Sequence, residues 1–298
     1  MIKHLTTFFM LTLATFAFDN NYSAKISECV QKYNAHELSA STSKKVVSKE
    51  TFIQESGSNI TVFNKELKTA KDIKIFKTKK IEPINYTNTI SLNNLQISEK
   101  KQKFFHMILP AILISKERLK QQRDRVLSLV STPKDELYVE DREFLEDLYK
   151  KYKTKNNKKL LSRLKTHPVS IILAQAAIES AWGESRFFKK GNNIFGMWSY
   201  NKNEPRIKAL GSRNGKAIYV KKYATLSDAI DDYFVVIGRG AYKSFREHRE
   251  VTDNPLVLVQ YLSNYCELGK SYTKKLKNFI VHNKLRKFDH YQIDSQYI

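Results

Sequence analysis

One stretch, VSIILAQAAIESAWG at residues 169–183, constrains the fold of this chain more than any other. Its apolar residues go almost all the way round a helical wheel, which is the pattern of a helix buried on every side. Pro168 suits the first turn of a helix, and Gly183 suits the left-handed residue that ends one. We therefore expect residues 169–183 to form the central helix of a mainly α domain.

The carboxylate of Glu179 lies inside this apolar run. Helical spacing places it beside Gln175 and Trp182, and Lys and Arg are absent between residues 169 and 185, so no helical neighbour neutralises its charge. Desolvation should then raise its pKa toward the range that a general acid needs. A helical glutamate is more often a solvated surface residue, but this wheel has almost no polar face. Glu179 is therefore the candidate catalytic acid.

The run AQAAIESAWGESRFFKKGNNIFGMWS resembles the signature of the glucosaminidase domain (glycoside hydrolase family 73) of bacterial cell-wall hydrolases, especially its Bax-type branch. The resemblance rests on ES-W-GES, an aromatic pair at Phe187 and Phe188, and GNNIFG, all at the family's spacing. It covers roughly residues 104–287. It implies a lysozyme-like, α-rich fold, and it assigns the catalytic acid to Glu179.

Glycoside hydrolysis also needs a second group that activates water or stabilises the developing oxocarbenium ion. Glu204 lies near the position of the family's other carboxylate, although the loop around it departs from the usual motif and a loop glutamate is more often solvated. The segment YCELGKSYTKKL resembles the family's late tyrosine motif. That resemblance places Tyr265 in the cleft near the acid and makes Tyr272 the second tyrosine of the motif, while packing roles remain open for both.

Three other aromatic residues, Trp182, Phe195 and Trp198, are candidates for binding substrate, because the flat apolar faces of sugars stack on aromatic rings. A core position is an equally good interpretation for Trp182 and for Trp198. The sequence has no HExxH motif, no CxxC pair and no glycine-rich phosphate loop, so it implies no metal and no cofactor.

The N-terminus has the pattern of a secretory signal peptide over residues 1–24, with Lys3, an apolar run at residues 5–18 and a small exit residue at Ala24. The apolar run is shorter than the roughly 18–20 residues that span a bilayer, so we expect no transmembrane segment in the mature chain. The protein should be exported to the periplasm or cell envelope, or secreted. Cys29 and Cys266 are too few for a disulfide framework, although an exported pair could form one bridge.

Residues 25–98 are polar, basic and weakly periodic, so we expect a basic leader that is largely extended or disordered, followed by a glucosaminidase-like catalytic domain at residues 99–290. The net charge of +22 draws the protein toward polyanions, and an anionic cell-envelope surface fits an exported chain. Codon bias of an AT-rich genome would also enrich lysine. Nucleic acid is a disfavoured partner, because the basic residues are scattered along the chain.

Periodicity predicts helices at residues 99–129, around 144–149, and at 157–164, 225–237, 255–261 and from 271. Pro110 should start or kink part of the first. Thr225 and Asp228 have the spacing of a capping box. Residues 194–200 and 217–223 have strand composition and flank a polar loop at 201–215, which predicts a small β-hairpin lobe leaning over the central helix.

The sequence thus predicts an exported peptidoglycan hydrolase that cleaves glycan strands as an endo-β-N-acetylglucosaminidase. A lytic transglycosylase or a lysozyme-type muramidase is the alternative of the same class, since those enzymes also place catalysis on a helical Glu-Ser. A non-catalytic cell-wall-binding protein that retains the fold is the alternative of a different class. An inverting, retaining or substrate-assisted mechanism depends on a separation between carboxyl groups, so all three stay open.

Overall fold

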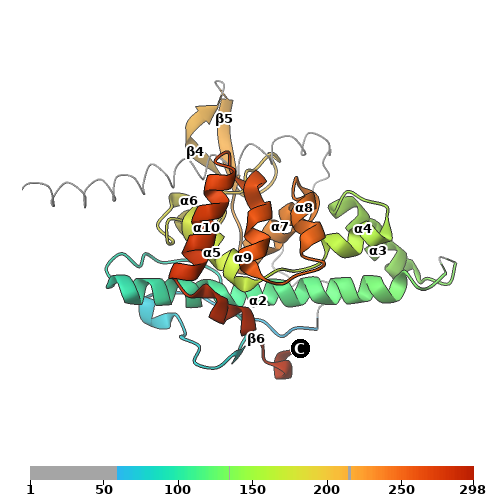
Figure 1. Cartoon of the computed structure of the whole chain (residues 1–298), viewed down its shortest axis with the longest axis horizontal. Helices are drawn as coiled ribbons and strands as arrows, with labels where there is room; N and C mark the ends of the chain where they lie inside the picture. Colours follow the sequence, from blue (N-terminus) through green and yellow to red (C-terminus); the bar gives the residue numbers. More distant parts are fainter. Residues whose placement is uncertain (1–58, 134, 214–215) are drawn as a thin grey trace, which may run out of the picture.

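The computed structural model describes residues 59–133, 135–213 and 216–298. Its longest element is α2 (Ile97–Leu129), a helix of 33 residues that runs along the molecule beneath the other helices (Figure 1). Pro110 lies within α2 and neither starts nor ends it. Every residue from 104 to 115 is buried, so this middle part of α2 forms the base of the core.

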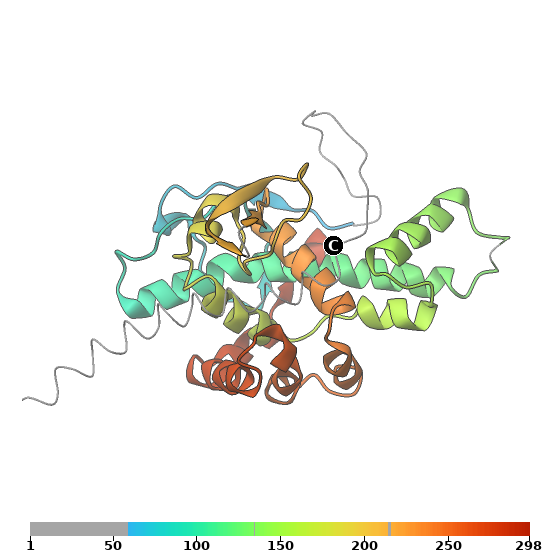
Figure 2. The ribbon, with the colours of Figure 1, turned by 90° about the horizontal axis from the view of Figure 1, so that it is seen from above.

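The shorter α-helices lie on one side of α2 in Figure 1, and Figure 2 shows them from above. In this body α5 and α7 contact α2, and α10 contacts α5. The α-helices are α3 (Val139–Lys151), α4 (Asn157–Arg163), α5 (Val169–Glu179), α6 (Arg186–Gly191), α7 (Leu226–Arg239), α8 (Lys243–His248), α9 (Pro255–Leu258) and α10 (Lys270–His282). The 3-10 helices are η1 (Ala70–Asp72), η2 (Val259–Tyr265), η3 (Leu285–His290) and η4 (Ser295–Tyr297).

The start of α7 confirms the predicted capping box. The hydroxyl of Thr225 accepts a hydrogen bond from the backbone N–H of Asp228, and the Asp228 carboxylate accepts one from the backbone N–H of Thr225. These two bonds satisfy N–H groups that a helix start leaves without partners.

The strands form three small pairs. β1 (Phe63–Lys65) pairs with β3 (Ile84–Tyr86), and β2 (Lys80–Ile81) pairs with β6 (Gln292–Ile293), both in parallel. β4 (Arg206–Arg213) and β5 (Lys216–Lys221) are antiparallel and form the hairpin lobe, which projects away from α2 (Figure 1).

The first strand of this hairpin differs from the prediction. Of residues 194–200, Trp198 makes an isolated bridge to Val220, and the strand β4 lies inside the predicted polar loop 201–215. The Asn193 side chain accepts from the backbone N–H of Met197 and donates to the Met197 carbonyl. The backbone of this segment meets β5 only locally, where the N–H of Lys221 donates to the Met197 carbonyl and the N–H of Ser199 donates to the Tyr219 carbonyl, both at 2.9 Å.

Residues 59–98, the described part of the expected leader, pack against the helical body. Their apolar side chains belong to the core: Leu67, Ile73, Phe76, Ile81, Ile84, Tyr86 and Leu92 are buried. The partners of this segment are distant in sequence, as in the pairing of β2 with β6, so its apolar residues need no regular local period. Residues 1–58, with the predicted signal peptide, the start of the leader and Cys29, lie outside the described residues.

The prediction of a mainly α domain with a small β-hairpin lobe is confirmed. Among the helices of the described residues, none combines the length and the apolar composition that a membrane crossing requires.

Candidate active site

Helix α5 ends at Glu179, earlier than the predicted end at Gly183, and an irregular turn follows it. Ala181, Trp182 and Gly183 have φ values of +52°, +59° and +87°. Two successive non-glycine residues in the left-handed region are uncommon, and such backbone conformations concentrate at functional sites. The carboxyl group of Glu179 therefore stands at a helix end next to a tightly constrained turn.

The hydroxyl of Ser180 holds this turn in place. It donates to the carbonyl of Ala176 at 2.6 Å and accepts from the backbone N–H of Gly183 at 2.9 Å. The Ser180 carbonyl also accepts from the N–H of Ser185 at 2.9 Å. These bonds give a structural reason for the serine that follows the glutamate in the motif.

The Glu179 side chain is 5% exposed, and its two carboxyl oxygens have different surroundings. Oε1 accepts a hydrogen bond from the Tyr272 hydroxyl at 3.2 Å, whereas Oε2 is buried and has no hydrogen-bond partner among the described residues. Burial raises the pKa of Glu179 from 4.5 to about 8, against the opposing effects of the Tyr272 hydrogen bond and the charge of Lys275. The carboxyl group is therefore protonated at neutral pH and can act as a proton donor.

Two buried tyrosines accompany this carboxyl group. The ring of Tyr265, at the end of η2, stacks on the ring of Tyr272, from α10, with 5.6 Å between centroids and an angle of 11°. Burial, and next the nearby charge of Glu179, raise the pKa of both hydroxyl groups well above 10. The Tyr265 hydroxyl has no hydrogen-bond partner among the described residues. The structure thus brings together Glu179, Tyr265 and Tyr272.

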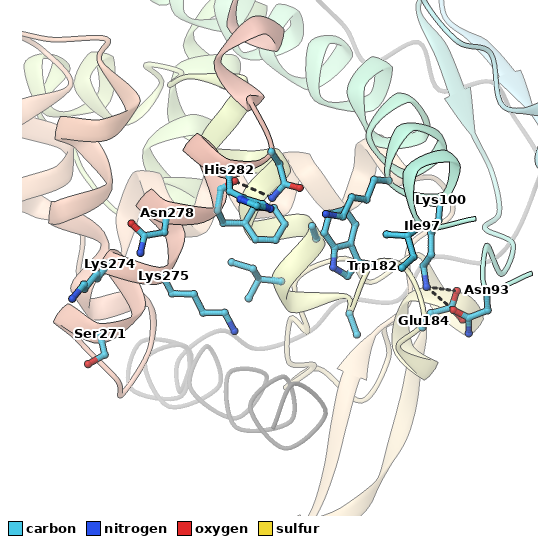
Figure 3. A pocket seen from close by; sticks show the side chains of 16 residues that line it. Asn93, Ile97, Lys100, Trp182, Glu184, Ser271, Lys274, Lys275, Asn278 and His282 are labelled. Atoms are coloured by element: carbon cyan, nitrogen blue, oxygen red, sulfur yellow. Dashed lines mark hydrogen bonds and ion pairs between the residues drawn. The ribbon is translucent and has the colours of Figure 1, made fainter. Parts of the chain in front are cut away.

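A groove of about 1120 Å³ lies between the start of α2 and α10 (Figure 3). Ile178 and Ala181, close to Glu179 in the sequence, line it, whereas the buried Glu179 side chain does not. Trp182 is half-buried in its wall, where its ring packs on Phe279 with 5.3 Å between centroids. The charged and titratable residues of the lining are Lys100, Lys101, Lys274, Lys275, His282 and Glu184. The groove is therefore predominantly basic, with one indole ring in its wall.

The other predicted site residues lie elsewhere. Phe195 is fully buried and stacks on Tyr233 with 4.5 Å between ring centroids, so it belongs to the core. Trp198 is also buried and packs on Tyr200 in the hairpin lobe. Glu204 is half-buried in the bend before β4, and its charge contributes, after burial and Asp232, to raising the pKa of Tyr223. The described contacts do not bring Glu204 to Glu179.

The two asparagines of the GNNIFG motif connect the hairpin lobe to the helical body. Asn192 has a left-handed backbone (φ +50°) and donates from Nδ2 to the carbonyls of Thr87 and Tyr223. Asn193 donates to the carbonyl of Lys221 in β5 at 2.8 Å. Both residues position neighbouring chain segments.

Three residues that the sequence did not indicate as functional join the site through Tyr272. Gln175 Nε2 donates to the Tyr272 hydroxyl at 3.1 Å, and Gln175 Oε1 accepts from the Tyr233 hydroxyl at 2.7 Å. The Tyr233 hydroxyl lies 2.9 Å from His167 Nε2. Tyr233 occupies an apolar position of an amphipathic helix, so periodicity alone assigns it to the core. Among the residues that the structure describes, no group of three or more His, Cys, Asp and Glu side chains could hold a metal ion.

Comparison with known proteins places these residues in a family. Residues 154–285 match the glucosaminidase family, described as mannosyl-glycoprotein endo-beta-N-acetylglucosaminidase. Protein bax of Escherichia coli (strain K12) is 27% identical over 198 residues, which cover 59% of this chain and 67% of that protein.

Two solved structures are also similar. The catalytic domain of the autolysin Auto from Listeria monocytogenes matches with a TM-score of 0.41 and 19% identity, over 67% of this chain and 99% of that one. An N-acetylmuramoyl-L-alanine amidase from Staphylococcus aureus matches with a TM-score of 0.35 and 21% identity, over 59% of this chain and 45% of that one. The family match includes Glu179, Tyr265 and Tyr272. Residues 154–285 of this chain therefore form a domain of the glucosaminidase family of glycoside hydrolases.

Proposed function

We propose that this chain is an exported peptidoglycan hydrolase that cleaves glycan strands as an endo-β-N-acetylglucosaminidase, with Glu179 as its general acid. The observation that carries the proposal is the asymmetric burial of the Glu179 carboxyl group. One oxygen is held by Tyr272, and the other is buried without a partner among the described residues. With a pKa of about 8, the group carries a proton at the pH of most cell envelopes and can give it to a leaving oxygen.

In the reaction, the proton of Glu179 passes to the glycosidic oxygen as the bond from that oxygen to C1 breaks. Positive charge then develops on C1 and the ring oxygen, and a water molecule adds to C1; the proton that this water loses passes to the solvent, from which Glu179 is protonated again. The buried Tyr265 hydroxyl next to Glu179 is available to hydrogen-bond this water or the acetamido group of the substrate. Glu204 is the candidate second carboxylate, and to serve as one it requires the hairpin lobe to close over α5.

The substrate proposal rests on charge. Peptidoglycan carries carboxylates on its peptide stems, and the groove between α2 and α10 is lined by four lysines, a histidine and one glutamate. The whole chain has a net charge of +22, which favours an anionic cell-envelope surface. The indole of Trp182 in the groove wall offers an apolar surface to a sugar ring. Phe195 and Trp198 support the neighbouring core and lobe.

Export is proposed from the sequence of residues 1–24, which has the pattern of a secretory signal peptide. An exported chain would meet its substrate in the periplasm or cell envelope. We propose residues 99–290 as the catalytic domain, with residues 59–98 packed onto it as part of the same body.

Zymography of the purified mature chain on peptidoglycan tests the activity, with Glu179→Gln as the matched inactive control. Mass spectrometry of the products tests the bond that is cleaved. New reducing ends at N-acetylglucosamine are expected. Reducing N-acetylmuramic acid would indicate a muramidase, and an anhydro-muramic end would indicate a lytic transglycosylase. Binding to the wall with no released product would make the chain a non-catalytic wall-binding protein.

A further inference from the structure

A continuous chain of side-chain hydrogen bonds runs through the core to the acid. It begins at His167 and passes through Tyr233, Gln175 and Tyr272 to Glu179, with heavy-atom distances of 2.9, 2.7, 3.1 and 3.2 Å along the way. All five side chains are buried, with exposed fractions between 0% and 5%. The residues come from segments as far apart as His167 and Tyr272.

The donors of this chain all point toward Glu179. The single hydroxyl proton of Tyr272 goes to Glu179 Oε1, and that hydroxyl accepts from the Gln175 amide. The hydroxyl proton of Tyr233 goes to the Gln175 oxygen, so His167 must donate to Tyr233 from Nε2. His167 Nδ1 then carries no proton, which agrees with its having no hydrogen-bond partner among the described residues.

We propose that His167, Tyr233 and Gln175 act through Tyr272 as positioning residues for the acid, by ordering these hydrogen bonds so that the acidic proton is held on Glu179 Oε2. Oε1 is occupied as an acceptor, so the proton resides on the oxygen that has no protein partner in the described structure. That oxygen is the one left for the glycosidic oxygen. The inference relies on the proposed function only in taking Glu179 as the acid.

His167, the first residue in this series of hydrogen bonds, is neutral. Burial, and then the charges of Arg249 and Lys116, lower the pKa of His167 well below 6.5. Its ring packs edge-on against Phe234 and Phe245, with 5.3 and 5.2 Å between centroids, which fixes its orientation. A neutral imidazole has one N–H donor, and the hydrogen bonds of Tyr233 require that donor to be at Nε2.

The series of hydrogen bonds from His167 to Tyr272 also acts on Glu179 after its proton has been transferred. Aligned hydrogen bonds polarise one another, so Tyr272 is a stronger donor to the Glu179 carboxylate than an isolated tyrosine would be. The other groups that face Glu179 are Lys275 of α10 and Tyr265 of η2, and neither belongs to the chain. A hydrogen bond to the charged form lowers the pKa of a carboxyl group. Breaking the chain should therefore raise the pKa of Glu179.

The test is a titration of the Glu179 carboxyl carbon by NMR in the full mature chain labelled with ¹³C-glutamate, with Glu179→Gln identifying the signal. Tyr272→Phe should raise the pKa of Glu179 by about one unit, because it removes the direct hydrogen bond. Tyr233→Phe should raise it by roughly a few tenths of a unit, because it removes only the polarising contribution. The alkaline limb of the kcat/KM profile should move in the same direction.

Tyr86→Phe is the matched control. Its hydroxyl is also fully buried and accepts from the backbone N–H of Lys74, so the variant loses one buried hydrogen bond outside the chain. It should lose stability and leave the pKa of Glu179 unchanged. If Tyr233→Phe behaves in the same way, the positioning role is refuted. If Tyr233→Phe does not fold, Gln175→Met breaks the chain at its centre and gives the same two outcomes.

The NMR titration uses no substrate, so it separates the inference from the proposed function. A raised pKa of Glu179 in Tyr233→Phe, together with no release of peptidoglycan fragments by the wild type, would support the positioning role and reject the hydrolase activity. Release of fragments, together with an unchanged pKa in Tyr233→Phe, would support the hydrolase activity and reject the positioning role.

Discussion

Polar side chains are paired differently in the helical body and next to the hairpin lobe. Around Glu179, the polar groups of α5, α7 and α10 are buried and satisfy one another through side chains, with a hydroxyl or amide at each step. Where the lobe joins the body, Lys221 of β5 and Tyr223 both bind the carboxylate of Asp232 in α7, at 2.8 and 2.6 Å, and the side chains of Lys221 and Asp232 are 25% and 20% exposed.

This difference indicates where each kind of chemistry can take place. A buried carboxyl group without a countercharge within hydrogen-bonding distance has its pKa raised by burial, so it keeps a proton that a solvated carboxylate would lose. A partly exposed ion pair is screened by salt, and its strength depends on how close the two side chains remain. The proposed acid, Glu179, therefore lies in the helical body, where burial and not an ion pair sets its surroundings.

The largest expected effect is that of Glu179→Gln. The amide keeps the shape of the side chain but has no acidic proton, so kcat/KM should fall by about 10²–10⁴. Rates of fragment release from peptidoglycan measure this effect, and circular dichroism checks that the fold is retained. Turnover close to that of the wild type would show that Glu179 is not the general acid. The functional distinction between the helical body and the lobe would then no longer hold.

The second prediction concerns pH. Glu179 must be protonated to act, so kcat/KM should fall about tenfold per pH unit above a pKa of about 8. The pKa is higher in the folded state than its ordinary value of 4.5, so protonation favours folding. Stability from this group is fully present below pH 4.5 and is lost as pH rises to about 8, by about 3 to 5 kcal/mol in total.

Chemical denaturation across this pH range measures the loss of stability, with Glu179→Gln as the control. The variant has no carboxyl group at this position, so its stability should be higher than that of the wild type at pH 8 and should depend less on pH. An equal pH dependence in both proteins would contradict the raised pKa.

The third prediction compares the two regions directly. Tyr265→Phe removes one buried hydroxyl next to Glu179 and should lower kcat/KM by about tenfold if that hydroxyl binds water or the acetamido group. Glu204→Gln should slow the reaction less than Glu179→Gln does, because a tyrosine or the substrate's own acetamido group can substitute in part. Steady-state kinetics on soluble glycan fragments compare the effects of Tyr265→Phe and Glu204→Gln. A silent Glu204→Gln beside a strongly impaired Tyr265→Phe would reject the second carboxylate.

The smallest effect on chemistry is expected from the second glutamate of the motif. Glu184 accepts from the Ser91 hydroxyl and the backbone N–H of Leu92, and it also pairs with Lys189 at 3.3 Å. Glu184→Gln should cost about 1–3 kcal/mol of stability, because these bonds hold residues 59–98 against the helix end. Thermal unfolding measures the cost. A moved alkaline limb in this variant would show that the two glutamates of the motif are not separate in function.

Local sequence was sufficient for the elements that depend on local physics. The apolar wheel of α5, the capping box of α7 and the burial of Glu179 were all predictable, because each depends on residues within a few positions of one another. The family resemblance was carried by closely spaced residues in the same way. The predicted hairpin failed at its first strand, because composition does not show that residues 194–200 would meet β5 only at an isolated bridge while β4 supplies the longer pairing.

Tertiary structure alone decided which atoms surround the acid. The sequence placed Gln175 beside Glu179, but the hydrogen bond comes from Tyr272, which is 93 positions away, and Gln175 acts on that tyrosine. The packing of residues 59–98 against the C-terminal strand was equally invisible, because a short irregular segment acquires its core partners only when distant chain segments meet. Sequence determined where the carboxyl group would be buried, and the fold determined which of its oxygens remains available to a substrate.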